Sequence, residues 1–364
     1  MSDPNYTNTK KRRYQYEPDG TDQSPHKLKA LSTNNQQQPT LEEQTIVDKP
    51  SYSKIAKQVA DHYNTRPQFG IEKRQESTIF HLRAFNNWIK SVLIGRHTDR
   101  NDKVLDMGCG KGGDLRKWQK VNIRELVGMD IAQVSVEQAQ DRYEKMRNPG
   151  FKARFYSQDC YGRPLTDTIQ PKDYKANIVS LQFCMHYAFE TEVKVRQMLQ
   201  NVSNHLEIGG RFVGTIPDCY WMVKKLRSLK GDQLEWSNSV YKVRFEQKSK
   251  YPVFGHKYWF TLKDALDDCP EYLVHFPTFI KLAREYGMEL LYRTPSHQYY
   301  METISTPQLN NLKGQNYRNL LFRMNVIDEM GRGPSPDEWE VTGLYLAFAF
   351  KKVRHWSSSE PSSL

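Results

Sequence analysis

The sequence predicts an α/β fold built on a doubly wound, mainly parallel sheet. Short apolar runs alternate with helical patterns between residues 103 and 215, and a glycine-rich loop follows the first of these runs directly. Strands that alternate with helices need crossover connections, and such connections place the strands parallel in one sheet. A length of 364 residues suits one large domain with appended segments.

Residues 1–50 are predicted to be a disordered tail. They are rich in Asn, Gln, Ser, Thr and Pro and poor in aliphatic side chains, so they cannot bury enough apolar area to offset the chain entropy. The basic run at 10–13 could contact RNA phosphate or serve nuclear import, but a solvated charge cluster is the simpler interpretation. Seven basic and seven acidic residues leave this tail neutral, so the net charge of +11 belongs to the rest of the chain and favours an anionic partner.

Apolar spacing predicts two helices before the first strand. Ile55, Val59 and Tyr63 recur every four residues, and a second helical pattern covers residues 79–93. A βαβ unit follows, with strands and helices in the order expected for parallel pairing. Its elements and those after it are strand 103–107, helix 115–120, strand 125–130, helix 134–146, strands 153–158 and 176–183, helix 191–206 and strand 211–215.

The composition of the chain changes after residue 218, where basic and aromatic residues become more frequent. Further elements are predicted there: strands at 241–245 and 257–262, a helix at 277–286 and a final strand at 343–352. The Asn-, Gly- and Pro-containing segment 305–335 is predicted to be an insertion or lid, and residues 354–364 a disordered end. The folded, catalytic domain is therefore expected over residues 51–353.

Several classes of protein are excluded by composition. The longest apolar runs, such as 344–350, are strand-sized, whereas a bilayer span needs roughly 20 residues. The first ten residues lack the apolar core of a signal peptide. No Cys-x-x-Cys pair occurs, so we expect a reducing compartment and no protein-bound metal. Because the apolar runs are short, we expect no membrane attachment. The five cysteines are Cys109, Cys160, Cys184, Cys219 and Cys269.

The glycine loop has the pattern Gly-x-Gly-x-x-Gly, formed by Gly108, Gly110 and Gly113. Asp130 lies 22 residues after Gly108, at the end of the second strand, where a carboxylate that binds a ribose is expected. This spacing fits a dinucleotide-binding enzyme as well as a methyl-donor enzyme. A phosphate-cradling NTPase loop is disfavoured because Lys111 is followed by Gly instead of Ser or Thr.

Acidic residues on both sides of the loop favour a methyl-donor enzyme over a dinucleotide-binding enzyme. Asp106 ends the first strand and Asp114 follows the loop, so both are expected near the ligand. Two carboxylates there would repel a pyrophosphate but suit an ammonium and a sulfonium, as in S-adenosylmethionine. Asp159 closes the third strand, where it could bond the adenine amino group, and Gln182 ends the fourth; strand-end capping explains either one equally well.

Seven motifs in order give the chain a resemblance to the eukaryotic mRNA cap guanine-N7 methyltransferases. The resemblance covers residues 55–352 and implies a Rossmann-like S-adenosylmethionine-dependent methyltransferase fold. The motifs are HYN (62–64), FNNWIK (85–90), VLDMGCGKGGDLRKW (104–118), QFCMHYAFE (182–190), YPVFGHKYWF (251–260), PEYLVHFP (270–277) and YLAFAF (345–350).

The resemblance implies two sets of site residues. Those for the methyl donor are Lys90, Gly108, Asp130, Asp159, Gln182 and Tyr187. Those for the capped RNA are Asn86, Asn87, Lys111, Lys117, Arg142, His186, Glu271 and Tyr345. Gln133 departs from the pattern, since relatives often carry an acidic residue there, which puts the local polarity of the pocket in doubt.

The implied reaction is methyl transfer to guanine N7, which carries a lone pair and no proton. No general base is therefore needed, and His186, Glu271 and Tyr345 are expected to position the cap. A carboxylate such as Glu271 suits guanine, whose N1–H and N2 amino group can both donate to it. A packed, hydrogen-bonded histidine is an equally good interpretation of His186, and Lys117 and Arg142 could each be ordinary exposed helix residues.

Two other classes share these features: an NAD-dependent oxidoreductase that uses the same loop, and a non-catalytic RNA-binding protein of the same fold. For the leading hypothesis we expect S-adenosylmethionine as methyl donor, capped RNA as substrate and a monomer in the nucleus. Other capping enzymes and the tail of RNA polymerase II are the expected protein partners.

Overall fold

Residues 54–65 and 76–356 are described by a computed structural model. The predictions for the tail at 1–50 and for residues 357–364 lie outside this part of the chain. The first predicted helix is α1 (Lys54–Thr65), and Asn64 Oδ1 accepts a hydrogen bond from the Val134 N–H at 3.1 Å.

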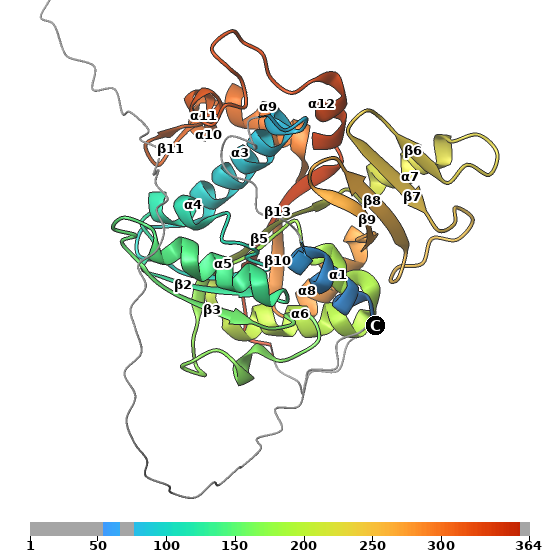
Figure 1. Ribbon diagram of the computed structural model, residues 1–364. Coiled ribbons are helices and arrows are strands. Elements are labelled where there is room, and N and C mark those ends of the chain that lie inside the picture. Colours follow the sequence, from blue (N-terminus) through green and yellow to red (C-terminus); the bar gives the residue numbers. More distant parts are fainter. Residues whose placement is uncertain (1–53, 66–75, 357–364) are drawn as a thin grey trace, which may run out of the picture. The chain divides into compact units, whose positions relative to one another are not determined.

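A seven-stranded sheet in the order β10-β13-β5-β4-β1-β2-β3 forms the centre of the fold (Figure 1). Neighbours from β3 to β5 pair in parallel, and only β13 runs against the others. The predicted doubly wound, mainly parallel sheet is confirmed. Its strands are β1 (Lys103–Met107), β2 (Glu125–Asp130), β3 (Lys152–Ser157), β4 (Ala176–Gln182), β5 (Leu206–Pro217), β10 (Met288–Pro295) and β13 (Tyr345–Lys352).

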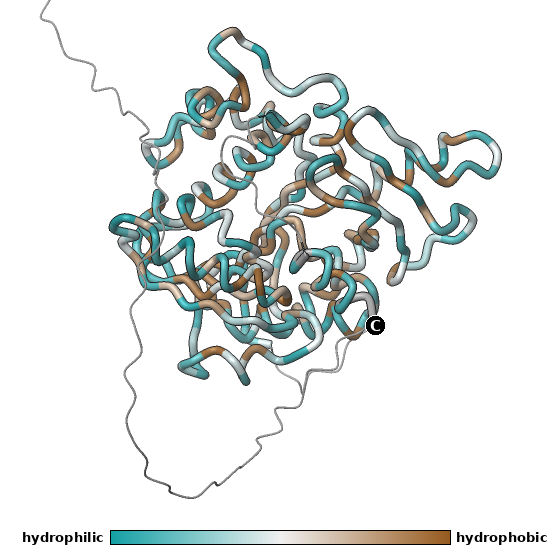
Figure 2. The backbone as a smooth tube through the Cα atoms, viewed as in Figure 1, coloured by the Kyte–Doolittle hydropathy of each residue, from teal (hydrophilic) through white to brown (hydrophobic). Residues whose placement is uncertain are grey.

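Each face of this sheet is covered by its own helices. Successive strand residues point to opposite faces, so Val104 and Leu105 belong to different hydrophobic clusters. Figure 2 shows apolar residues concentrated along these central strands. One face carries α3 (Phe80–His97), α4 (Leu115–Lys120), α9 (Ser296–Ser305) and α11 (Tyr317–Arg323); the other carries α6 (Glu192–His205) and α8 (Phe276–Glu285). Helix α5 (Gln133–Glu144) lies beside β2 and β3.

A second, antiparallel sheet follows the order β6-β7-β8-β9. Its inner residues pack with α7 and with the start of β13 in a third cluster. Because Tyr258 on β8 pairs with Glu271 on β9, both side chains are buried on the same face. The elements are α7 (Cys219–Ser228), β6 (Glu235–Ser237), β7 (Tyr241–Phe245), β8 (Lys257–Leu262) and β9 (Leu266–Tyr272).

The predicted insertion at 305–335 folds into short elements that pack on α3. Trp88 Nε1–H donates to the Tyr317 carbonyl at 2.9 Å, and both rings are buried in one cluster. The elements are α10 (Pro307–Asn310), the hairpin β11 (Asn311–Leu312) and β12 (Gln315–Asn316), and α11. The insertion is thus part of a core, and its movement as a lid remains a prediction.

Several elements were not predicted, for local reasons. Strand β9 contains two aspartates and a proline, which are poor strand formers, and β10 lacks a clear alternation of apolar residues. Helix α12 (Pro336–Thr342) did have a sequence signal: Ser335 and Glu338 form a capping box. Glu338 also accepts the N–H of Leu82 in the first turn of α3 at 3.1 Å, which joins two distant helices.

Replacing Phe279 by alanine should lower the free energy of unfolding by about 3–5 kcal/mol, because this ring is fully buried among other phenylalanines between α8 and the sheet. Urea denaturation measures the loss. Phe322→Ala is the control: that side chain is 50% exposed, so its removal should change stability by no more than about 0.5 kcal/mol. Equal losses in the two variants would contradict this account of the core.

Candidate active site

The loop between β1 and α4 needs glycine at two positions, Gly108 and Gly110. Gly108 has a φ of +78°, and a Cβ built there would lie 2.6 Å from Cys184 Sγ. Gly110 has a φ of +51°, and its N–H donates to Asp130 Oδ2 at 2.9 Å. Left-handed backbone of this kind is costly for any residue with a Cβ. The loop therefore folds against the end of β2.

A cavity of about 300 Å³ lies at the carboxyl ends of β1, β2 and β4. Ligands of doubly wound sheets bind at this edge. All six residues expected to contact the methyl donor line it, although they come from five different parts of the chain. They are Lys90, Gly108, Asp130, Asp159, Gln182 and Tyr187. Their assigned roles remain predictions.

Asp130 holds the glycine loop while it lines the cavity. Its Oδ1 accepts the Ala132 N–H and its Oδ2 the Gly110 N–H, both at 2.9 Å. Burial raises the pKa of Asp130, and these two N–H donors partly offset the rise. Each carboxylate oxygen can accept a second hydrogen bond, so Asp130 retains the capacity to bind ribose hydroxyls.

The other two strand-end residues also bond locally. Asp159 Oδ1 accepts the N–H groups of Tyr161 and Gly162, at 2.9 and 3.0 Å, while its Oδ2 accepts no hydrogen bond from the described residues. Gln182 accepts from Thr215 at 3.1 Å and donates to Ser180 at 3.2 Å. Asp159 thus caps backbone N–H groups after β3 and keeps one oxygen for a ligand, whereas the two partners of Gln182 are side-chain hydroxyls.

Asp114 is shared by two lysines in a largely buried ion cluster. Lys90 Nζ and Lys117 Nζ lie 2.8 and 2.7 Å from the same oxygen, Oδ1, and none of the three side chains is more than 15% exposed. Burial alone would raise the pKa of Asp114, but the two ammonium groups outweigh it and hold the pKa below the usual range. Its negative charge is therefore neutralised within the protein.

This cluster corrects the charge argument drawn from the sequence. Neither Asp106 nor Asp114 lines the cavity. Burial raises the pKa of Asp106, and the nearby charge of Asp114 raises it further, which favours the protonated form. The carboxylates that do face the cavity are Asp130, Asp159 and Glu190, and Glu190 forms an ion pair with Lys194.

A second cluster of polar side chains, formed by Tyr258, Glu271 and His186, is buried between β8, β9 and the segment after β4. Tyr258 Oη donates to Glu271 Oε2 at 2.5 Å, and His186 Nε2 lies 3.4 Å from Glu271 Oε1. His186 is 2% exposed, and neither of its ring nitrogens has a hydrogen-bond partner among the described residues. The alternative interpretation of His186 was a packed histidine whose ring is hydrogen-bonded within the protein. The ring is packed, but no described residue forms a hydrogen bond with it.

Glu271 and Tyr345 also line a space of about 10 Å³, enough for roughly one water molecule and too small for a base. The larger cavity lies close to this group, because its lining includes Phe183 and Tyr187. Phe183 contacts Tyr345 edge to face at 4.9 Å, and Tyr187 contacts His186 at 4.3 Å. The two predicted sites are therefore neighbours.

Phe183 was not predicted as a site residue. It has a φ of +59°, and its N–H donates to the Thr215 carbonyl at 3.0 Å. A bulky residue in left-handed backbone is an outlier of the kind that gathers at functional sites. Tyr258 was also missed, since only strand register brings it beside Glu271. The only sequence signal was that each lies in a motif of the resemblance.

None of the residues expected to bind the capped RNA lines the larger cavity. Lys117 Nζ bonds Asn87 Oδ1 at 2.9 Å besides its ion pair, and Lys117 lines a different cavity on the far side of this cluster. It is 11% exposed, so the interpretation as an ordinary exposed helix residue is wrong. Asn86, Lys111 and Arg142 are partly buried outside the lining of the larger cavity.

Within residues 54–65 and 76–356, no helix is both long and apolar enough to cross a membrane. In the same part of the chain, no group of three metal-ligating side chains is found.

The strand order, the glycine loop and the carboxylate at the end of β2 define the Rossmann-like fold of S-adenosylmethionine-dependent methyltransferases. Residues 47–353 match the family model described as the mRNA (guanine-N(7))-methyltransferase domain. The chain belongs to this family. An NAD-dependent oxidoreductase and a non-catalytic RNA-binding protein find no support in this match.

Three relatives, each named mRNA cap guanine-N(7) methyltransferase, illustrate the similarity. The protein from Cryptococcus neoformans is 45% identical over 311 residues, which cover 83% of this chain and 49% of that protein. The protein from Schizosaccharomyces pombe is 46% identical over 302 residues, 81% of each chain. Protein 1 from Arabidopsis thaliana is 41% identical over 315 residues, 82% of each chain. The matched region thus spans only about half the length of the Cryptococcus relative.

Asp114→Asn should lower the free energy of unfolding at pH 7 by about 3–5 kcal/mol, since it leaves two largely buried lysines without a counter-charge. The pKa of Asp114 is lowered by folding, so its contribution is present above the unfolded pKa of about 3.9 and is lost as the pH falls below it. The difference between variant and parent should therefore shrink in acid. Urea denaturation at several pH values measures it.

Asp141→Asn is the control, because its ion pair with Lys145 is 61% and 75% exposed on the two sides. Its effect should stay within about 0.5 kcal/mol at every pH. A loss at Asp114 that is no larger than this would show that the cluster does not stabilise the fold.

Proposed function

We propose that this chain transfers a methyl group from S-adenosylmethionine to N7 of the guanosine cap of RNA, converting GpppN-RNA to m7GpppN-RNA. One observation carries the proposal beyond family membership. The cavity lined by the six donor residues shares the wall of Phe183 and Tyr187 with the group around Glu271. A donor and a guanine could thus be held on two sides of one narrow boundary. We place this activity in residues 51–353.

S-adenosylmethionine, when bound, supplies a methyl carbon that takes the N7 lone pair while the carbon–sulfur bonding pair leaves with sulfur. The guanine gains the positive charge and releases no proton, so the chain needs no general base. What the protein contributes is alignment of the two reactants, which in favourable cases lowers a barrier by about 7–11 kcal/mol. The buried, ordered side chains described above are suited to such positioning.

The donor cavity has the acceptor groups that this ligand needs. We assign the two ribose hydroxyls to Asp130, whose orientation is held by the N–H groups of Gly110 and Ala132. We assign the adenine amino group to Asp159 Oδ2. Three carboxylates and two ammonium groups line the cavity, an excess of negative charge that suits a cationic donor.

For the cap, we assign the N1–H and N2 amino group of guanine to Glu271. Tyr258 holds one oxygen of this carboxylate in place, and His186 faces the other. The unpaired ring nitrogens of His186 are available to a base that enters from the larger cavity. Tyr345 is assigned to packing against the base, and none of these residues acts as a proton acceptor.

For the triphosphate bridge, Lys111 and Arg142 are the proposed contacts, and Asn86 and Asn87 are proposed as further contacts of the capped RNA. Lys117 is a weaker choice, because its ammonium group is already bound by Asp114 and Asn87. A nuclear location, a monomeric state and contacts with other capping enzymes or the RNA polymerase II tail are proposed from the family resemblance alone.

The decisive experiment compares methyl transfer from labelled S-adenosylmethionine to GpppN-RNA and to uncapped pppN-RNA. Label should appear only in the capped RNA and should be recovered as 7-methylguanosine. Equal labelling of both RNAs would exclude the cap as the target. Binding without product would favour a non-catalytic RNA-binding protein.

Glu271→Gln and Asp130→Asn should separate the two halves of the site. Glu271→Gln should lower kcat/KM for capped RNA by about tenfold or more, since a carboxylate that accepts two donors from guanine becomes an amide that can accept only one. Its affinity for S-adenosylmethionine, measured by calorimetry, should stay within about twofold of the parent.

Asp130→Asn should show the reverse pattern, with donor affinity reduced by about tenfold or more. Unchanged cap turnover in Glu271→Gln would remove Glu271 from the site. Thermal melting of both variants checks that the fold is retained.

A further inference from the structure

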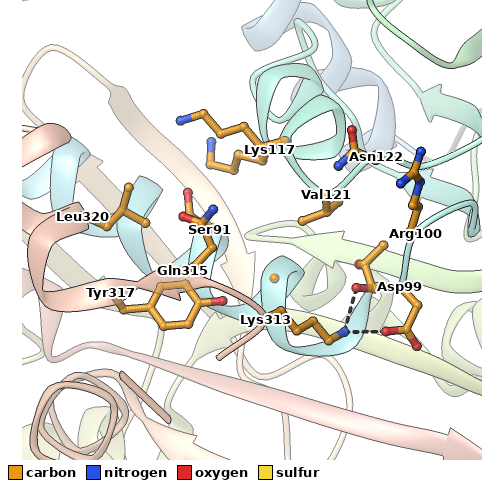
Figure 3. A pocket seen from close by; sticks show the side chains of 13 residues that line it. Ser91, Asp99, Arg100, Lys117, Val121, Asn122, Lys313, Gln315, Tyr317 and Leu320 are labelled. Carbon is orange, nitrogen blue, oxygen red and sulfur yellow. Dashed lines mark hydrogen bonds and ion pairs between the residues drawn. The ribbon is translucent and has the colours of Figure 1, made fainter. Parts of the chain in front are cut away.

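A second cavity, of about 240 Å³, lies between α3, α4 and the segment 313–320 (Figure 3). Its lining residues come from these three segments and from the turns that follow α3 and α4. Ser91 and Gly95 of α3 form one wall together with Thr98, the residue that follows this helix, and Lys313 and Tyr317 form another. The insertion therefore completes a cavity that α3 and α4 alone would leave open.

Two hydroxyl groups in this cavity have no hydrogen-bond partner among the described residues. They are Thr98 Oγ1 and Tyr317 Oη, and their residues are 2% and 1% exposed. Figure 3 shows the Tyr317 hydroxyl pointing toward the middle of the lining side chains, on the side of Lys313. Buried hydroxyls without partners are costly, so their presence at one cavity indicates a ligand that completes them.

The absence of a side chain at Gly95 lets the end of the Tyr317 ring pack directly against α3. A Cβ built there would lie 2.3 Å from Tyr317 Oη. Any other residue at position 95 would therefore displace the ring from its place in the lining of the cavity. Gly95 lies inside α3, where glycine is unfavourable, so it needs a packing reason of this kind.

The charge of the lining selects the kind of ligand. Four cationic side chains face the cavity against one carboxylate, Asp99, which is bound by Lys313 at 2.7 Å. Hydroxyl and amide donors together with cations are the usual partners of phosphate oxygens. The volume exceeds that of a bare phosphate. The cations are Arg100, Lys117, Lys120 and Lys313, and the amides are Asn122 and Gln315.

We propose that this cavity binds a phosphorylated sugar, such as one nucleotide unit, at a site separate from the methyl-donor cavity. The phosphate would lie among Arg100, Lys120 and Lys313, and Thr98 and Tyr317 would donate to its oxygens or to a sugar hydroxyl. Lys117 lines the same cavity, but its ammonium group is bound by Asp114 and Asn87. Lys117 places the two sites next to each other, since it lines this cavity while its ammonium group and that of Lys90 share Asp114. The ligand is either a nucleotide of the RNA chain beyond the cap or a free nucleotide.

The test uses the double variant Thr98→Val and Tyr317→Phe, which removes both hydroxyls with little change of shape. Because neither hydroxyl is hydrogen-bonded, the melting temperature without ligand should stay the same or rise. Loss of binding would then not come from unfolding. Tyr299→Phe is the control: it also removes a buried hydroxyl from the same cluster, but Tyr299 does not line the cavity.

The probes are AMP and inorganic phosphate, titrated by calorimetry at fixed chloride, and two substrates, the cap dinucleotide GpppA and a capped RNA of about ten nucleotides. If the ligand is a free nucleotide, the parent binds AMP and the double variant binds it at least tenfold more weakly, with KM for RNA unchanged. If the ligand belongs to the RNA, KM for the capped RNA rises at least fivefold while KM for GpppA does not.

Tyr299→Phe should behave as the parent in every assay. Parent-like AMP and phosphate binding in the double variant, together with unchanged KM for both substrates, would overturn the proposal. So would absence of AMP binding to the parent at millimolar concentration with unchanged KM values. The calorimetric arm needs no methyl transfer, so the proposed function could fail while this site stands.

Discussion

The carboxylate of Asp114 is the contact on which the arrangement of both cavities depends. It sits at the junction of the glycine loop and α4, and it binds one lysine from α3, through both oxygens, and one from α4, through Oδ1. Ion pairs this far from water are strong only when the charges balance and the remaining donors are satisfied. Here Lys117 also donates to Asn87, so α3 and α4 are held at one separation. The methyl-donor cavity lies on one side of this cluster and the cavity completed by the insertion on the other.

The turn after β4 is the second constraint, and it acts on the boundary between donor and cap. Phe183 takes left-handed backbone there, held by its N–H contact with Thr215 on β5. That conformation turns the chain so that Phe183 and Tyr187 line the donor cavity while they contact Tyr345 and His186. Left-handed backbone at one residue thus places the two groups of side chains on either side of one wall, and under the proposed function methyl transfer across it needs only alignment.

That Gly108, Asp130 and Gln182 line one cavity was largely predictable, because they lie at or just after the carboxyl ends of β1, β2 and β4, and parallel strands end at a common edge. Their roles toward a methyl donor stay a prediction. The electrostatic part of the site prediction failed at Asp106 and Asp114, because burial and neighbouring lysines decide a carboxylate's charge and neither can be read along the chain. The same limit applied to Lys117, which the resemblance assigned to phosphate and which the fold binds to Asp114.

The sequence by itself determined the order of strands and helices, the glycine loop and the family, since these depend on local spacing and on motifs in order. Only the tertiary structure decided which groups are paired and which are not. Thr98 and Tyr317, more than 200 residues apart, have unpartnered hydroxyls at one cavity because the insertion packs on α3, a contact that no local pattern encodes. Whether a polar group is hydrogen-bonded and whether a charge is balanced depend on which residues are neighbours in space. For that reason only the tertiary structure determines them.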